Sequence, residues 1–271
     1  MNSPRHLTIF MVFCLVWVMA CVHSGETVSD ERARRVSAAD QIEFDFADGA
    51  SLLVVSPVEM NSLTLNNFQV GTAKNRILIV GVQVEEGGKE NVADTVISSI
   101  TLGNRALTLL SGSEVQLSSI WRGKEYFLKV ALYYLLNPPT GKNDITVSFA
   151  GPVTSANVGA ISLSNAQQTA PVNLVTNKEE NQKKIITHIT TKSNGAWVVD
   201  IVGCGHKSKL KPKTPDHTQR FNTQEESGGK SSLLGATLPV PAAGEVALHW
   251  AQSRRSINRL VHIAVEISPY R

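Results

Sequence analysis

The stretch Glu125–Pro171 decides the fold and reads EYFLKVALYYLLNPPTGKNDITVSFAGPVTSANVGAISLSNAQQTAP. In residues 125–136, apolar and aromatic side chains occupy both alternating positions, which predicts a strand buried on both faces at the centre of a sheet. The Pro-Pro-Thr-Gly turn at 138–141 ends this strand. Residues 143–149 then alternate between polar and apolar, and 157–164 form a third apolar segment. The stretch therefore predicts an antiparallel all-β module.

Similar patterns recur on both sides of this stretch. Residues 75–85 (NRILIVGVQVE) and 196–204 (AWVVDIVGC) are predicted as buried central strands. Residues 47–49 are predicted as a turn, and the polar residues 172–184 as a solvated loop. Many short strands with frequent turns, and no fixed-period repeat, predict a jelly-roll-like antiparallel β-sandwich. Further strands are predicted at 42–46, 51–56, 62–68, 95–102, 106–110, 114–121, 185–191, 216–224, 231–238, 245–252 and 259–268.

Composition excludes several classes of protein. The chain has 271 residues, of which 42% are hydrophobic, enough to fill a core. The net charge is only +3, whereas a nucleic-acid-binding surface needs a larger excess of clustered Lys and Arg. Only three cysteines are present, and Cys14 lies near the N-terminus, so the chain is not a disulfide-stapled scaffold.

Residues 1–24 have the features of a signal peptide. Arg5 supplies a positive charge, and the uncharged apolar run Leu7–Ala20 follows it. At about 1.5 Å per residue this run is short for a bilayer core of about 30 Å, so a secretory signal is favoured over a permanent span. The sequence therefore predicts an exported protein.

Two alternatives remain for the end of this signal. Residues 18–21 (VMAC) resemble a bacterial lipobox, in which Cys21 becomes lipidated and anchors the protein to the cell envelope. Ordinary cleavage after Ser24 would instead release a secreted protein. Under both, 25–40 is a flexible spacer and 41–271 is the β-sandwich domain. If the lipobox functions, Cys21→Ala should abolish fatty-acid labelling, and unchanged labelling would exclude it.

A family resemblance extends over residues 75–203. The order of its pieces is similar to a recurring β-sandwich module of bacterial secreted and surface proteins, often of unassigned role. The resemblance implies a jelly-roll-like architecture and, by analogy, adhesion or glycan binding. The pieces are NRILIVGV at 75–82, ISSITLGNRALT at 97–108, ALYYLLNPPTGKNDITVSF at 131–149, VGAISLSNAQQTAPV at 158–172 and GAWVVDIVG at 195–203.

Candidate chemical groups are few, and no motif of a known catalytic class occurs. Cys204 and His206 form a Cys-x-His pair after a predicted strand, but no second pair has metal-ligand spacing, so Cys204 is interpreted as a core residue. A glycoside hydrolase needs two acids about 5–9.5 Å apart. The strand-associated acids to test are Glu125, Asp200 and Glu245. Four histidines are interpreted as separate sheet residues: His188, His217, His249 and His262.

The cofactor prediction is none, with calcium as an alternative. Asp45 precedes the predicted turn at 47–49 and Asp48 lies within it, near Gly49, and clustered oxygens suit this cation. Two carboxylates in a turn are, however, common turn chemistry. Calcium therefore remains an alternative that depends on that turn.

The strongest candidates for binding lie in loops. Lys207, Lys209, Lys211 and Lys213 place four positive charges in seven residues, a pattern that attracts acidic partners. Trp121 adjoins a turn and is the tryptophan best placed to stack on a sugar ring. We therefore expect a non-catalytic extracellular or cell-surface binding module for a glycan or a surface protein. Membrane association is expected only through an N-terminal lipid. The alternatives are an extracellular polysaccharide hydrolase and a structural envelope protein.

Overall fold

The architecture is all-β. The computed structural model describes residues 41–53, 60–87, 96–121, 123–153, 155–224, 231–253 and 255–271. Every element with described bounds is a strand, and the strands pair in antiparallel ladders. The predicted antiparallel β-sandwich class is thereby confirmed. The predicted signal peptide 1–24, Cys21 and the spacer 25–40 lie outside the described residues. Within the described ranges, no helix has the length and apolar character needed to span a bilayer.

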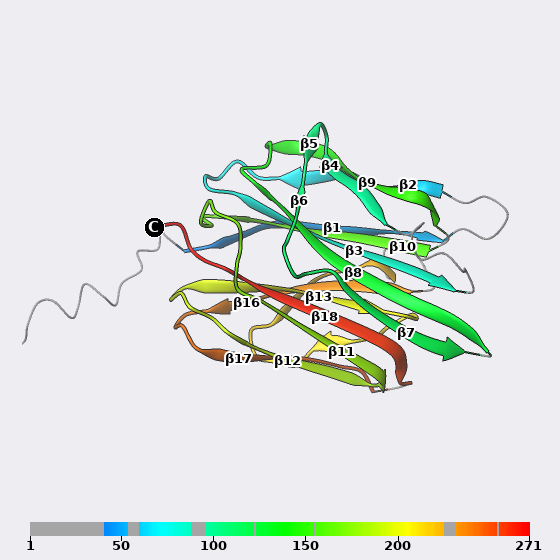
Figure 1. Ribbon diagram of the computed structural model, residues 1–271. Helices are drawn as coiled ribbons and strands as arrows, with labels where there is room; N and C mark the ends of the chain where they lie inside the picture. Colours follow the sequence, from blue (N-terminus) through cyan, green and yellow to red (C-terminus); the bar gives the residue numbers. More distant parts are fainter. Residues whose placement is uncertain are drawn as a thin grey trace, which may run out of the picture. The chain divides into compact units, whose positions relative to one another are not determined.

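The first half of the chain forms two stacked sheets, which are the upper two layers in Figure 1. We call them sheet I and sheet II. Sheet I has the order β2 (Met60–Val70), β9 (Gly141–Val153), β4 (Ile97–Leu102), β5 (Arg105–Ala106). Sheet II has the order β1 (Glu43–Leu53), β10 (Ser155–Ser164), β3 (Ile77–Gly87), β8 (Lys124–Leu136), β6 (Thr108–Leu109), with β7 (Val115–Trp121) also paired to β8.

The second half forms the lower two layers, sheet III and sheet IV. Sheet III has the order β11 (Leu174–Gln182), β18 (Ile257–Ile267), β13 (Ala196–Cys204), β16 (Ser232–Val240), β15 (Thr218–Asn222). Sheet IV has the order β12 (Lys184–Thr190), β17 (Glu245–Ala251), β14 (Lys211–Pro212).

The two halves share one topology. The order β1-β10-β3-β8 in sheet II corresponds strand for strand to β11-β18-β13-β16 in sheet III. Likewise β2-β9-β4 in sheet I corresponds to β12-β17-β14 in sheet IV. Even the extra edge strands agree, since β6 and β15 occupy the same place beyond β8 and β16. The fold is thus a duplicated sandwich, whose halves pack against each other through sheets II and III.

Three apolar layers fill the spaces between the four sheets. Leu65, Val80 and Ile145 belong to the cluster between sheets I and II. Ile79 and Ile201 belong to the cluster between sheets II and III. Both faces of β8 are apolar because the strand lies between two cores. Leu132 packs into the core between sheets II and III, and Leu135 packs into the core between sheets I and II. The smaller clusters between sheets III and IV complete the core and contain Ile185, Val198, Val202, Leu248 and Trp250.

Two local predictions were wrong. The segment predicted as a loop at 172–184 contains β11, a full strand on the edge of sheet III. Within the described parts of the chain, β11 pairs in its ladder with β18 alone. Its charged side chains are compatible with an edge position, where most of them face solvent and discourage further strand pairing. The predicted turn at 47–49 lies inside β1, whose only irregularity is a register shift between Phe44 and Phe46.

Candidate functional site

A polar cluster is buried between sheets III and IV. Asp200 lies on β13 with the same parity as Val198 and Val202, so its side chain points into the core between these two sheets. Oδ1 of Asp200 accepts a hydrogen bond from Nε2 of His217 at 2.8 Å. Oδ2 accepts hydrogen bonds from Nε2 of His262 at 2.7 Å and from Nε1 of Trp250 at 2.6 Å.

Hydrogen bonds outweigh desolvation at this carboxylate. Burial alone raises the pKa of Asp200, but the charges and hydrogen bonds of His217 and His262 lower the pKa well below its usual range. Thr187 extends the network, because its hydroxyl lies 2.7 Å from Nδ1 of His262. Since Asp200, His262 and the His217 side chain are buried, we interpret the cluster as a support for the sheet III–sheet IV interface rather than as a reaction centre.

The outer face of sheet IV carries a cationic surface. Lys184 of β12 and Lys211 of β14 lie directly opposite Ala251 of β17, one on each side. Paired residues in neighbouring strands project from the same face of a sheet, so both lysines extend outward over a small central side chain. The next row contains His249, whose carbonyl accepts a hydrogen bond from the backbone N–H of Lys213 at 2.8 Å. We call Lys184, Lys211, Lys213 and His249 the cationic face.

The charges on this face act on one another. The pKa of His249 is lowered, first by burial and then by the positive charges of Lys184 and Lys213. The two lysines come from different segments, because Lys184 begins β12 and Lys213 directly follows β14. The exposed acid on the same sheet, Glu245, lies at the far end and pairs with Nδ1 of His188 at 2.8 Å. The cationic face therefore has a positive potential suited to an anion.

The four lysines predicted as a binding loop form an ordered segment. Lys207, Lys209, Lys211 and Lys213 are all exposed, whereas Ser208 and Leu210 between them are buried. The backbone is held in place, because Ser208 N–H donates to Ser232 Oγ at 2.9 Å and Lys209 N–H to Gln252 Oε1 at 2.8 Å. The segment ends as β14 on the edge of sheet IV, which brings Lys211 and Lys213 to the cationic face.

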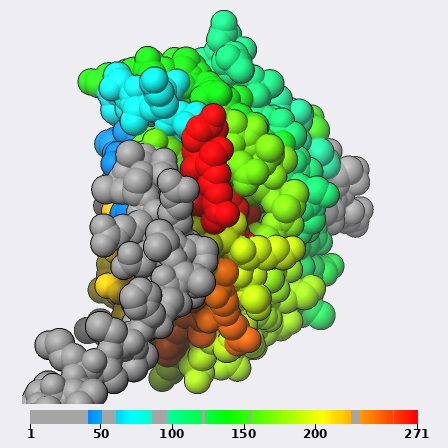
Figure 2. Space-filling view, turned by 90° about the vertical axis from the view of Figure 1, so that its left-hand side faces the viewer, coloured from blue at the N-terminus to red at the C-terminus, as the bar shows by residue number. Residues whose placement is uncertain are grey.

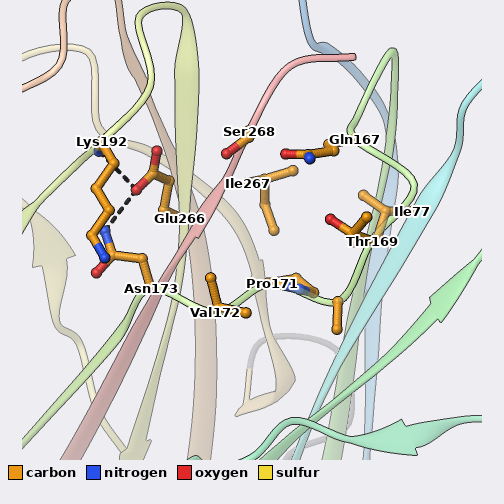
Figure 3. Close-up of a pocket in the computed structure, with 11 residues that line it drawn as sticks. Ile77, Gln167, Thr169, Pro171, Val172, Asn173, Lys192, Glu266, Ile267 and Ser268 are labelled. Atoms are coloured by element: carbon orange, nitrogen blue, oxygen red, sulfur yellow. Dashed lines mark hydrogen bonds between the residues drawn. The ribbon is translucent and has the colours of Figure 1, made fainter. Parts of the chain in front are cut away.

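A different cavity, of about 390 Å³, lies beside the connection between the two halves (Figure 3). Ile77, Pro171 and Ile267 line it, and Glu266 is the one acid among its described lining residues. That carboxylate is already engaged, since it accepts hydrogen bonds from Asn173 Nδ2 at 2.6 Å and from the backbone N–H of Lys192 at 2.9 Å. We interpret Glu266 as a group that fixes the connection rather than as a ligand site.

The C-terminal segment closes the same region. In Figure 2 it lies on the surface as a red strip beside the light green atoms of the connection. Pro269 forms a β-bridge with Ala166, and Tyr270 N–H donates to the carbonyl of Asn165 at 2.7 Å. The end of the chain is thereby bound to the segment that joins the two halves.

The acids considered for a hydrolase do not come together. Glu125 is exposed on β8 of sheet II, and Glu245 is exposed on the outer face of sheet IV. Asp200 is buried in sheet III with its oxygens occupied. Three different sheets thus hold the three carboxylates, and the structure does not pair them around a cleft.

Cys204 and His206 also separate. Burial raises the pKa of the Cys204 thiol to about 12, so the thiol stays protonated within the core. His206 is exposed at the surface. The described part of the chain contains no group of three or more metal-binding side chains. Asp45 accepts hydrogen bonds from Gly71 and Ser162, and Asp48 from Gly49.

Sequence reasoning missed the convergence of particular residues. His217 and His262 meet at Asp200, although the sequence predicts them to be separate sheet residues. Lys184, from the segment predicted as a loop, and Lys213 both lie beside His249. The alternation within each strand gave the inward or outward direction, but not which strands are neighbours. The side chain of Trp121, the predicted stacking residue, lies outside the described residues.

Comparisons of the chain with protein-family models, curated proteins and solved structures found no match.

Proposed function

We propose that the protein is a non-catalytic binding module of the cell surface or extracellular space, and that its ligand is an anionic glycan. The observation that carries the proposal is the cationic face, on which Lys184 of β12 lies on one side of β17, and Lys211 and Lys213 of the β14 segment lie on the other. The exported location rests on the signal-like residues 1–24 and on the resemblance to secreted bacterial β-sandwich modules.

The shape of the face favours a polymer over a small molecule. Ala247 and Ala251 are the outward side chains of β17 on either side of His249, so small residues flank the ring on this face. Trp250 of the same strand is buried and cannot stack on a sugar. Recognition on this face therefore depends on charge, and an extended polyanion can contact several lysines together.

Removing the charges of the cationic face should weaken binding to a polyuronate. In the triple variant Lys184→Gln, Lys211→Gln, Lys213→Gln we expect affinity for polygalacturonate to fall about tenfold or more, because each exposed charge pair contributes up to about 1 kcal/mol. Affinity of the unmodified protein should also fall between about 0.1 and 1 M salt, as the screening length shrinks from about 10 to 3 Å. Surface plasmon resonance with immobilised polymer measures both effects.

The matched control removes three positive charges elsewhere, by Lys74→Gln, Arg105→Gln and Lys142→Gln. All three residues are exposed, and they lie on or beside sheets I and II. This control has the same net charge as the test variant. If both triple variants lose the same affinity, net charge alone accounts for binding and the cationic face is not the site. Binding that does not respond to salt, or no binding to any anionic polymer, would contradict the proposed function.

A further inference from the structure

A polar cavity lies where the two halves meet at one end of the molecule. The end of β3 and the start of β8 contribute from sheet II, and the end of β13 and the start of β18 contribute from sheet III (Figure 1). The cavity has a volume of about 240 Å³ and is lined by Glu85, Tyr126, Gly205, His206, Asn258 and Arg259. Both halves of the duplicated fold therefore supply its walls.

Arg259 is the central group of this cavity. It is one of the largest fully buried side chains, with an exposed fraction of 1%. Its Nη2 forms an ion pair with Glu85, and its Nη1 donates to Ser119 Oγ at 2.6 Å. Its Nε, in contrast, is buried and has no hydrogen-bond partner among the described residues. An unpaired buried donor is unfavourable, so the site is incomplete without an acceptor.

The surroundings of Nε are kept open by a glycine. A Cβ added at Gly205 would lie 3.0 Å from Nε and 2.9 Å from Nη2 of Arg259, so any side chain at this position would crowd the guanidinium edge. Asn258 is oriented beside it, because its Oδ1 accepts a hydrogen bond from the Arg259 backbone N–H at 2.9 Å. This bond leaves the Nδ2 amide of Asn258 as a donor for a ligand.

Positive charge extends beyond the cavity. A neighbouring cavity of about 340 Å³ shares His206 and is also lined by Lys207, Gln252 and Arg255. His206 lines the first cavity with Arg259 and the second with Arg255. Its pKa is lowered by burial and then by the charges of these two arginines. Among the described residues that line the two cavities, Glu85 is the only acid. A monoanion fits this balance better than a dianion, because Glu85 already shares the guanidinium.

We propose that the two cavities bind one hexuronic acid residue, with its carboxylate accepting hydrogen bonds from Nε of Arg259 and Nδ2 of Asn258. The sugar ring then extends past His206 toward Lys207, where the ordered lysine segment begins and leads to the cationic face. This inference rests on the proposed function for its ligand class. It adds a subsite that selects carboxylates, whereas the cationic face accepts any polyanion.

Calorimetric titration of the protein with sodium glucuronate and with glucuronate methyl ester tests the subsite. We expect the acid to bind and the uncharged ester, which keeps the same ring, to bind at least tenfold more weakly. Gly205→Ala should weaken binding of the acid at least tenfold by crowding the Arg259 edge. The matched control is Gly244→Ala, because an added Cβ there meets nothing within 4 Å. His206→Gln, at an exposed position, should weaken binding without a change in thermal stability.

The outcomes separate this inference from the proposed function. Equal binding of acid and ester, or unchanged binding in a folded Gly205→Ala protein, would overturn the subsite while leaving polymer binding by the lysines intact. Should Gly205→Ala fail to fold, unchanged binding in His206→Gln would overturn it instead. Conversely, if the protein binds glucuronate but no anionic polymer, the result would support the subsite and contradict the proposed function of the cationic face.

Discussion

Replacing Asp200 by alanine should lower the free energy of unfolding by about 3–5 kcal/mol. The substitution removes the acceptor of three buried donors, Nε2 of His217, Nε2 of His262 and Nε1 of Trp250, and leaves them in an apolar interface. Because domains are stable by only about 5–15 kcal/mol, this is a large part of the total. Urea unfolding at neutral pH, followed by tryptophan fluorescence, measures the difference.

The effect should depend on pH in a defined direction. The folded-state pKa of Asp200 lies below its unfolded value of about 3.9. A lowered pKa means that the stabilisation is complete above the unfolded pKa and is lost as pH falls toward the folded pKa. The stability difference between the parent and Asp200→Ala should therefore narrow below about pH 4. Glu180→Ala, at an exposed position of β11, is the control, and an equal loss in both variants would refute the role of the cluster.

The second large effect is expected at Phe221. Its ring lies between Gly159 of sheet II and Gly235 of sheet III, and a Cβ added at either glycine would overlap the ring. Phe221→Ala should lower the free energy of unfolding by about 3–5 kcal/mol, through lost burial and a cavity between the halves. Gly159→Ala should lower it by about 1–3 kcal/mol, because the ring must move in a close-packed core.

A double-mutant cycle makes this prediction specific. When Phe221 is already alanine, adding Gly159→Ala should cost little, since the group that it overlaps is gone. Gly244→Ala should leave stability unchanged in both backgrounds. Strictly additive losses at Gly159 and Phe221 would show that the two residues do not share a contact. Urea unfolding of the four proteins provides the required free energies.

The local pattern predicted the central strands well. Residues 75–85, 125–136 and 196–204 correspond to β3, β8 and β13, because a strand buried on both faces is apolar at consecutive positions. The edge strand β11 was missed because its polar side chains face solvent on an unpaired edge. Burial, which produces the apolar pattern, is weakest at such edges.

The duplication and the sites could not be predicted in the same way. The two equivalent turns before β9 and β17 read PPTG at 138–141 and PAAG at 241–244, and the strands beyond them share only apolar alternation. Several different apolar residues can fill the same buried position, so two halves can keep one topology although their sequences differ. Equally, Asp200 and His217 meet only because β13 and β15 both pair with β16, a relation that no local pattern encodes.

The shared topology also has a consequence for assembly. Sheets II and III are apolar on the faces that contact each other. Either half alone would therefore expose a continuous hydrophobic surface and associate with other molecules. Joining the halves in one polypeptide turns a bimolecular encounter into an intramolecular one, with a high effective concentration. The association therefore withstands dilution. Each half therefore keeps its partner half at any concentration of the protein.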